Sequence, residues 1–141
     1  MIYFAKIRKQ KGDNWLVEFP DLSGCMTEGS TLEKALSSAR EALNGWLASN
    51  CDRNLDIPNP VLRKGRSYHP LEVDLPISFA IRLRRLRARK GLTQLQAAKK
   101  LGVTQQAYAR LESPTRTNPS LTTLQKIADS LDVEIDVRLV S

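Results

Sequence analysis

The segment from Thr93 to Glu112 constrains the fold of this chain more than any other. It reads TQLQAAKKLGVTQQAYARLE. Thr93 and Thr104 are each suited to begin a helix, because a threonine oxygen can accept a hydrogen bond from a free amide of the first turn. Gly102 ends the first of these helices, and Val103 follows it directly. The segment therefore predicts two short helices joined by a very tight turn.

Two such helices form a helix-turn-helix element, whose packing requires particular side chains. Ala98 is small, which lets the two helices cross closely. Gly102 can adopt the left-handed conformation that the turn needs. Val103, Tyr108 and Leu111 are placed to fill the wedge between the helices.

The start of the second helix carries Thr104, Gln105 and Gln106. A glutamine amide can pair with N6 and N7 of adenine in the major groove. In this motif, the first residues of the second helix are the ones that reach base edges. The pattern predicts binding to duplex DNA.

The distribution of charge supports a polyanionic partner for the second half. Residues 1–75 hold ten basic and ten acidic side chains, whereas residues 76–141 hold twelve basic and five acidic ones. The whole net charge of +7 therefore lies in the second half. Such an asymmetry is typical of nucleic-acid binding, although Arg82, Arg84, Arg85 and Arg89 could also be merely solvated.

The rest of the second half is predicted to be helical, with one exception. We expect helices over residues 77–91 and after Ser120, with a proline-containing loop before the latter. The tail 133–140 alternates apolar and polar residues and predicts a strand without a partner in its own domain. An unpaired apolar strand exposes backbone N–H and C=O groups that can pair with another chain. We therefore expect this strand to pair with its copy in a homodimer or a higher even oligomer.

The first half predicts a sheet with one helix across a face. Strands are expected over residues 2–7, 14–19 and 70–76, with a short one at 25–29. Ser30 and Glu33 predict a capping box at the start of a helix that runs to Ser49. Leu71, Val73 and Leu75 are expected to face this helix. The predicted fold class is α+β, with domains at residues 1–75 and 76–141.

Several classes of protein are disfavoured. The longest uncharged stretch, Ala42–Cys51, is too short for a membrane span, and the N-terminus does not read as a signal peptide, so we expect a cytoplasmic protein. Cys25, Cys51 and the single histidine, His69, are too few for a zinc site or a Ser-His or Cys-His hydrolase. We therefore expect no metal, no cofactor and no enzymatic activity.

The second half resembles a known family in the residues just described. Residues 78–135 are similar to the Xre/Cro/CI class of helix-turn-helix regulators, and the run Thr104-Gln105-Gln106 looks like that of lambdoid phage repressors. The resemblance implies that Gln94 holds a DNA phosphate and that Arg87 pairs with Glu112. The chain departs from the class at Ser113-Pro114-Thr115, where the family usually has Arg/Asn-Gly.

These arguments give a set of candidate residues for binding palindromic operator DNA through the major groove. They are Gln94, Thr104, Gln105, Gln106, Arg110 and Arg116.

The first half resembles a second family. It contains FPDLSGCMTEGSTLEKALSSAREALNGWL, which is similar to the signature of HicB antitoxins, with Ser23 in place of the family's proline. The resemblance implies a partial RNase H-like ββ(β)αβ unit, followed by a DNA-binding domain. It also implies a HicA-like toxin, an mRNA-cleaving ribonuclease, as the partner of the first unit, and repression of the common promoter by the second.

The residues that would contact such a toxin are less well defined. Trp15, Phe19, Asp21 and Leu22 are candidates, although the aromatic residues, with Trp46, also fit a hydrophobic core. Asp21 and Glu28 fall in a loop and do not form the carboxylate cluster that two-metal hydrolysis requires.

We therefore expect an antitoxin that neutralises a ribonuclease and represses its own operon. Two other hypotheses remain open. The chain could be a stand-alone transcription regulator whose first unit senses a ligand. It could also be a residual nuclease of RNase H type, whose magnesium-dependent activity would require Asp21.

Overall fold

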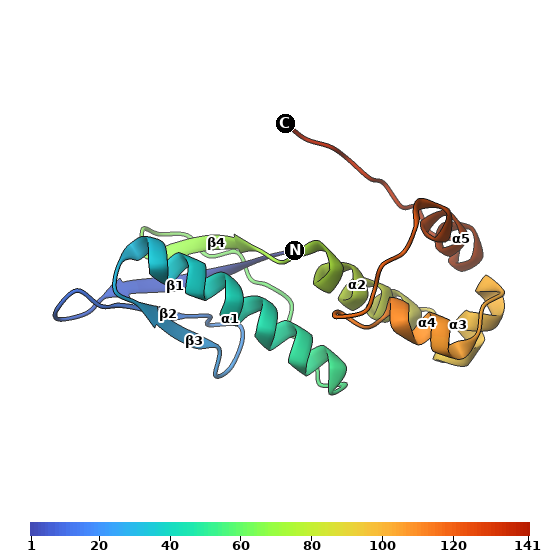
Figure 1. Ribbon diagram of the computed structural model, residues 1–141, viewed down its shortest axis with the longest axis horizontal. Coiled ribbons are helices and arrows are strands. Elements are labelled where there is room, and N and C mark those ends of the chain that lie inside the picture. The colour runs from blue at the N-terminus through green and yellow to red at the C-terminus, as the bar shows by residue number, and fades with distance from the viewer. The chain divides into compact units, whose positions relative to one another are not determined.

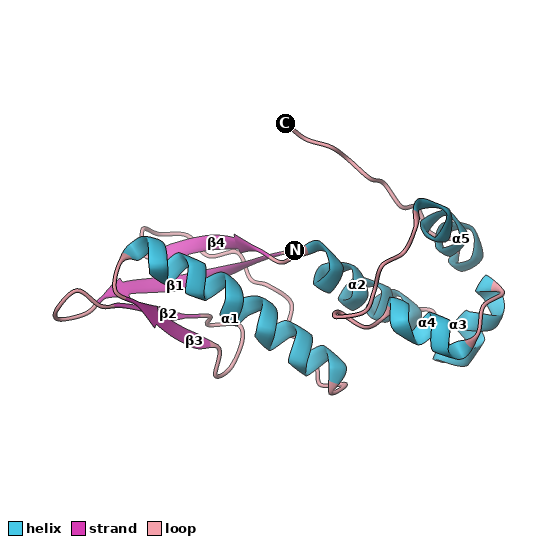
Figure 2. Ribbon diagram, viewed as in Figure 1, coloured by secondary structure: helices cyan, strands magenta, loops and turns pink.

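The computed structural model describes all 141 residues and divides into two units, Met1–Ser78 and Phe79–Ser141 (Figure 1). The predicted α+β class is confirmed, with strands in the first unit and helices in both (Figure 2). The sequence predicts a boundary between residues 75 and 76, whereas the two units meet inside a helix. No helix combines the length and the apolar character that a membrane span requires.

The first unit is a four-stranded antiparallel sheet with a long helix packed against it. The strand order is β3-β2-β1-β4, so β3 and β4 form the two edges. The elements are β1 (Ile2–Lys9), β2 (Trp15–Glu18), β3 (Met26–Gly29), α1 (Leu32–Asp52) and β4 (Tyr68–Glu72). This is the predicted ββ(β)αβ order.

The core of this unit lies between α1 and the sheet. Alternate residues of β1, namely Tyr3, Ala5 and Ile7, are buried, as strand geometry requires when one face of a sheet is covered. On α1, a stripe with a spacing of four residues is buried: Ala35, Ala39, Leu43, Leu47 and Cys51. The helix approaches β3 so closely at Gly29 that a Cβ atom there would lie 2.4 Å from the amide nitrogen of Ala35.

Two details at the ends of elements differ from the prediction. Thr31, not Ser30, is the N-cap of α1, and its Oγ1 accepts a hydrogen bond from the amide of Lys34 at 3.1 Å. The predicted capping box is therefore wrong, because the third residue after the true cap is Lys34 and not Glu33. The helix also runs past Ser49 to Asp52.

The junction after β4 also differs from the prediction. β4 ends at Glu72, and Leu75 is 79% exposed instead of facing α1. Leu75 begins α2, with Pro76 in its first turn. Proline is tolerated there because the amide it lacks would have no partner within the helix. Of the three residues expected to face α1, only Val73 is fully buried.

The second unit is built from four helices around a small core. They are α2 (Leu75–Arg89, shared with the first unit), α3 (Gln94–Leu101), α4 (Gln105–Leu111) and α5 (Leu121–Leu131). Side chains from all four meet in one cluster: Leu83, Ala97, Ala98, Leu101, Tyr108, Ile127 and Leu131.

The predicted strand at residues 133–140 is not formed in this single chain. Val133 and Ile135 pack against the core, whereas Val137, Leu139 and Val140 are 62%, 98% and 88% exposed. A strand needs a neighbour for its backbone hydrogen bonds, and this unit contains no other strand.

The close approach at Gly29 yields a prediction with a control in the same unit. Gly29→Ala forces a Cβ atom into the backbone of α1, so it should lower the free energy of unfolding by about 1–3 kcal/mol. Gly45 lies on the exposed side of α1, where a Cβ would meet nothing within 4 Å. Gly45→Ala should therefore raise stability by about 0.5–1 kcal/mol. Denaturant unfolding of the two full-length variants tests both, and equal effects would contradict the packing.

Candidate nucleic-acid interface

The tight turn between α3 and α4 follows from local hydrogen bonds. Thr93 and Gln96 form a reciprocal capping box at the start of α3, with each side chain bonded to the other's backbone amide. At its end, Gly102 adopts a left-handed φ of 72°, and the amide of Val103 donates to the carbonyl of Ala98 at 3.0 Å. Thr104 then caps α4 through the amide of Ala107. Three consecutive residues thus end one helix and begin the next.

The inner surface of the motif is tightly packed. Ala97, Ala98 and Tyr108 are each at most 1% exposed. Val103 and Leu111 are partly buried against the same cluster. The side chains expected to fill the wedge between the helices do lie inside it. Their packing holds α4 against α3, while the first turn of α4 remains exposed to solvent.

A buried carboxylate ties this motif to the preceding helix. Glu112, directly after α4, is completely buried. Arg87 of α2 forms a two-pronged contact with it, Nε to Oε2 at 2.7 Å and Nη2 to Oε1 at 3.0 Å. Arg84 Nε lies 3.8 Å from Oε1, and the side-chain amide of Gln94 donates to the same oxygen at 3.4 Å. We call these four residues the Glu112 cluster.

The cluster fixes the protonation of its neighbours. The hydrogen bond to Glu112 raises the pKa of Arg87 further above its usual value, although burial works against it. Burial, followed by the contact with Glu112, raises the pKa of the Tyr108 phenol. Arg87 is therefore a permanent cation and Tyr108 a neutral phenol, so neither side chain changes its charge in the physiological pH range.

The candidate DNA-binding residues divide into two environments. Gln105, Gln106, Arg110 and Arg116 are exposed. Gln94 is exposed to a smaller extent at the start of α3, where it belongs to the Glu112 cluster. The Oγ1 atom of Thr104 is used in the cap of α4. The glutamines at the start of α4 are therefore the polar groups most available to base edges.

The loop after α4 shows what replaces the family's usual Arg/Asn-Gly. Ser113 and Pro114 are buried. The amides of Arg116 and Thr117 both donate to the carbonyl of Ser113, at 3.1 and 2.8 Å. The loop thus turns back directly after the Glu112 cluster and presents Arg116 to solvent.

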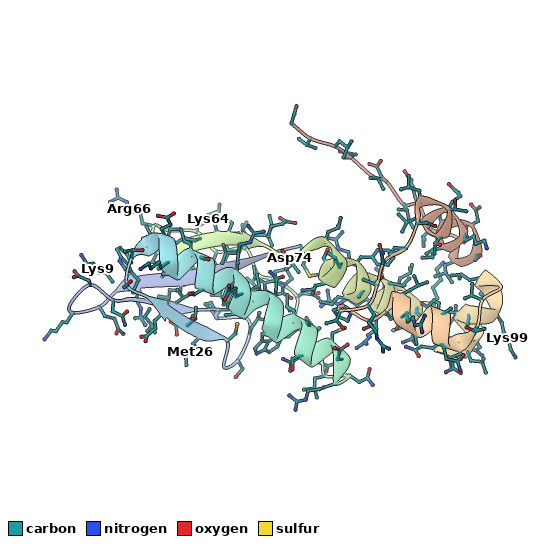
Figure 3. All side chains as sticks on the ribbon, viewed as in Figure 1. Lys9, Met26, Lys64, Arg66, Asp74 and Lys99 are labelled. Carbon is teal, nitrogen blue, oxygen red and sulfur yellow. The ribbon has the colours of Figure 1, made fainter.

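Two further basic side chains were not among the candidates. Lys99 and Lys100 are exposed in the last turn of α3, and Figure 3 shows Lys99 extending away from the helix. Cations at this end of a helix also stabilise it through the helix dipole. The sequence pattern alone does not distinguish this stabilising role of Lys99 and Lys100 from a role in phosphate binding.

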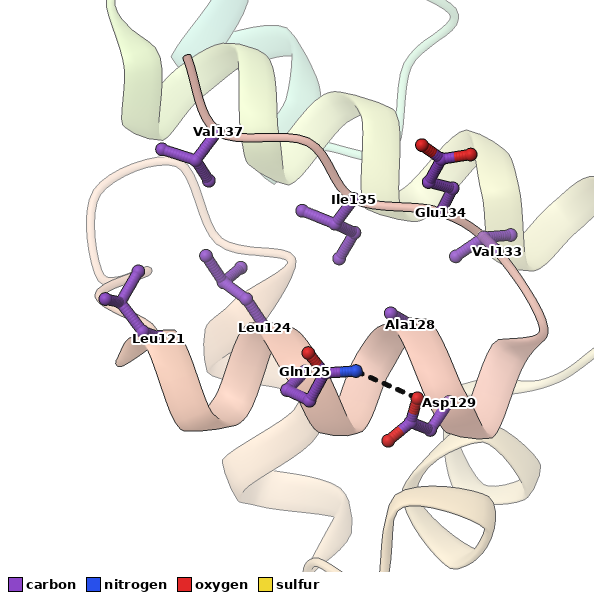
Figure 4. A pocket seen from close by; sticks show the side chains of 9 residues that line it. All are labelled: Leu121, Leu124, Gln125, Ala128, Asp129, Val133, Glu134, Ile135 and Val137. Atoms are coloured by element: carbon purple, nitrogen blue, oxygen red, sulfur yellow. Dashed lines mark hydrogen bonds between the residues drawn. The ribbon is translucent and has the colours of Figure 1, made fainter. Parts of the chain in front are cut away.

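Beside α5, the chain end forms one wall of an open groove with a volume of about 500 Å³ (Figure 4). Leu121, Leu124 and Ala128 of α5 line one side, and Val133, Ile135 and Val137 of the tail line the other. Gln125 and Asp129, joined by a 2.9 Å hydrogen bond, form a polar margin. The groove thus combines six apolar side chains with three polar ones, the third being Glu134, and lies next to the exposed end of the tail.

In the first unit, two of the four candidate toxin-binding residues are buried. Phe19 and Leu22 are 3% and 0% exposed, so they belong to the core and offer no surface to a partner. Trp15 is half-buried, with Lys9 Nζ 5.8 Å from the centre of its ring. The half-buried Trp46 donates a hydrogen bond to the carbonyl of Ser23.

Asp21 has a structural partner on each oxygen. Its Oδ1 accepts from Arg63 at 2.8 Å and its Oδ2 from the amide of Val61 at 3.0 Å. Glu28 accepts from Asn14 at 2.7 Å. No group of three or more His, Cys, Asp or Glu side chains in the chain is arranged to hold a metal ion. Asp21 thus fastens the loop before β4 to the turn after β2.

The fold and this surface define a class of two-part regulators, with a sheet-and-helix unit followed by a DNA-binding helix-turn-helix. Residues 3–68 match the family model described as HicB-like antitoxin of bacterial toxin-antitoxin system. Residues 83–137 match the family model described as helix-turn-helix.

The chain is also similar to several known proteins. "Antitoxin HicB 1" of Photorhabdus laumondii is 28% identical over 143 residues, covering 99% of this chain and 87% of the relative. "UPF0150 protein Ta0767" of Thermoplasma acidophilum is 34% identical over 58 residues, covering 41% of this chain and 84% of that protein. A chain in a solved structure titled "Structure of HipA-HipB-O2-O3 complex" is 28% identical, with 50% of this chain and 99% of that chain covered and a TM-score of 0.42. The chain belongs to the HicB-like antitoxin family and carries a helix-turn-helix domain in its second half.

The Glu112 cluster predicts a large stability effect. Glu112→Ala leaves Arg87 without its carboxylate, and Arg87→Ala removes both short charged hydrogen bonds of the buried carboxylate, leaving it only the 3.8 Å contact with Arg84 and the bond from Gln94. Each should cost about 3–5 kcal/mol of unfolding free energy. The control is Arg138→Ala, which breaks a 2.6 Å ion pair with Asp136 whose two side chains are exposed. It should leave stability unchanged. Thermal unfolding of the full chain decides between these outcomes, and similar effects for all three variants would contradict the role of burial.

Proposed function

We propose that this protein is the antitoxin of a HicAB-type pair, which binds and neutralises an mRNA-cleaving toxin and represses its own operon. The observation that carries the proposal is the union in one chain of a HicB-like unit and a helix-turn-helix. Residues 1–75 hold ten basic and ten acidic side chains, a balance that suits a protein partner. Both proposed partners, operator DNA and mRNA ribonuclease, place the protein in the cytoplasm.

Repression would operate through the start of α4. Gln105 and Gln106 are exposed on its first turn, and a glutamine amide can pair with adenine in the major groove. Gln94, Arg110 and Arg116 would hold phosphates on either side, which sets the register on DNA without reading its sequence. The Glu112 cluster supports this arrangement, because it fixes Gln94 and the end of α4 at one point.

A palindromic operator requires two copies of the motif. The groove beside α5 and the exposed tail support a homodimer, since they are adjacent on the same chain and both present apolar side chains. Val137, Leu139 and Val140 of one copy would pair with the tail of the other and cover its groove. The tail would then become the strand that it does not form in a single chain.

The first experiment separates the two proposed activities in the full chain. The double variant Gln105→Ala, Gln106→Ala changes only exposed side chains. It should lose repression of a reporter fused to its own promoter, since each bidentate pair contributes about 1–3 kcal/mol of base discrimination. It should still restore growth when the toxin from the neighbouring gene is induced. Loss of both activities, or of neither, would contradict the division of labour.

The second experiment tests the dimer. Removing residues 137–141 deletes the exposed end of the tail but retains Val133 and Ile135, which pack on the core. Sedimentation at micromolar concentration should show a shift from dimer to monomer, with weaker operator binding and unchanged helical circular dichroism. The matched control Arg138→Ala keeps the apolar residues and should remain dimeric. A truncated protein that stays dimeric would refute pairing through the tail.

A further inference from the structure

Basic side chains gather at one end of the sheet in the first unit. The amide of Ile7 donates to the carbonyl of Ser67 at 2.8 Å, so the antiparallel contact of β1 with β4 continues beyond the strand pair Lys6–Tyr68. The end of β1 therefore lies beside the loop that precedes β4. We call the basic residues of these two segments the basic end: Arg8, Lys9, Lys11, Lys64 and Arg66. Figure 3 shows Lys9, Lys64 and Arg66 projecting outward there.

Most of these cations have no anionic partner. Arg8 lies 3.5 Å from Glu18, and Arg63 in the same loop is neutralised by Asp21. The other four members of the basic end are exposed and form no ion pair. Of the acids near these segments, Asp13 is free of ion pairs and Asp21 is already engaged. The basic end thus carries an excess of positive charge.

This excess is a local property, because residues 1–75 as a whole are neutral in formal charge. A row of phosphates would neutralise this excess. Lysine and arginine side chains both contact phosphates readily, and such contacts carry no sequence information.

We propose that the basic end binds the phosphate backbone of the DNA that flanks the operator, as a second contact beside the helix-turn-helix. This inference rests on the proposed repressor function. Because both contacts belong to one chain, binding of the first raises the effective concentration of the second. The second contact adds affinity and salt dependence but no sequence preference.

The test uses the full-length protein and two duplexes. One is the shortest operator selected from a randomised pool, and the other extends it by about 15 base pairs, roughly 50 Å, on each side. The variant is Lys64→Gln with Arg66→Gln. On the long duplex, the slope of log K against log salt should become less steep by up to about 0.9 for each phosphate that the variant no longer neutralises. On the short duplex, wild type and variant should have the same slope.

The matched control is Lys34→Gln with Arg53→Gln, which removes two exposed cations outside the basic end, one on α1 and one at its C-cap. It should bind the long duplex as wild type does. A Lys64 and Arg66 variant that matches this control overturns the inference while leaving the repressor function intact. If the variant instead loses affinity for a single-stranded RNA and not for the long duplex, the inference is also overturned. Wild-type protein that binds neither duplex would refute the proposed function itself.

Discussion

The interaction on which the second unit depends is the contact between Glu112 and Arg87. A carboxylate with no solvent exposure is tolerable only when cations and donors surround it, and here they come from two other helices. α2 supplies two arginines and α3 supplies Gln94. The register of three helices is therefore set at one buried point. The exposed first turn of α4 has a defined position because the other end of that short helix is fixed there.

The motif was predictable because its signals are local. Threonine caps, a left-handed glycine and a small alanine act within a few residues, and they place Thr93, Gly102 and Thr104 as expected. The resemblance to known regulators supplied the pairing of Arg87 with Glu112. Charge counting could identify the basic half but not the role of each arginine. Arg84 approaches Glu112, whereas Arg82 and Arg89 are exposed, and only the packing of α2 separates them.

What could not be predicted depends on contacts between distant residues. Phe19 and Leu22 lie in a motif that suggested a binding surface, yet the turn after β2 folds them into the core. Asp21 is engaged by Arg63 and Val61, which lie 42 and 40 residues later in the chain. The tail has the alternation of a strand but lacks a neighbour in a single chain. In each case the sequence pattern carried no information about the partner.

The boundary between the two units falls inside α2, after Ser78. The amide of Ser78 donates to the carbonyl of Asp74, so the backbone at this point is engaged in helical hydrogen bonding and is not an open loop. Proteases cleave exposed, irregular segments most readily, and this junction offers none. An exchange of DNA-binding domains between related antitoxins would have to cross a continuous helix.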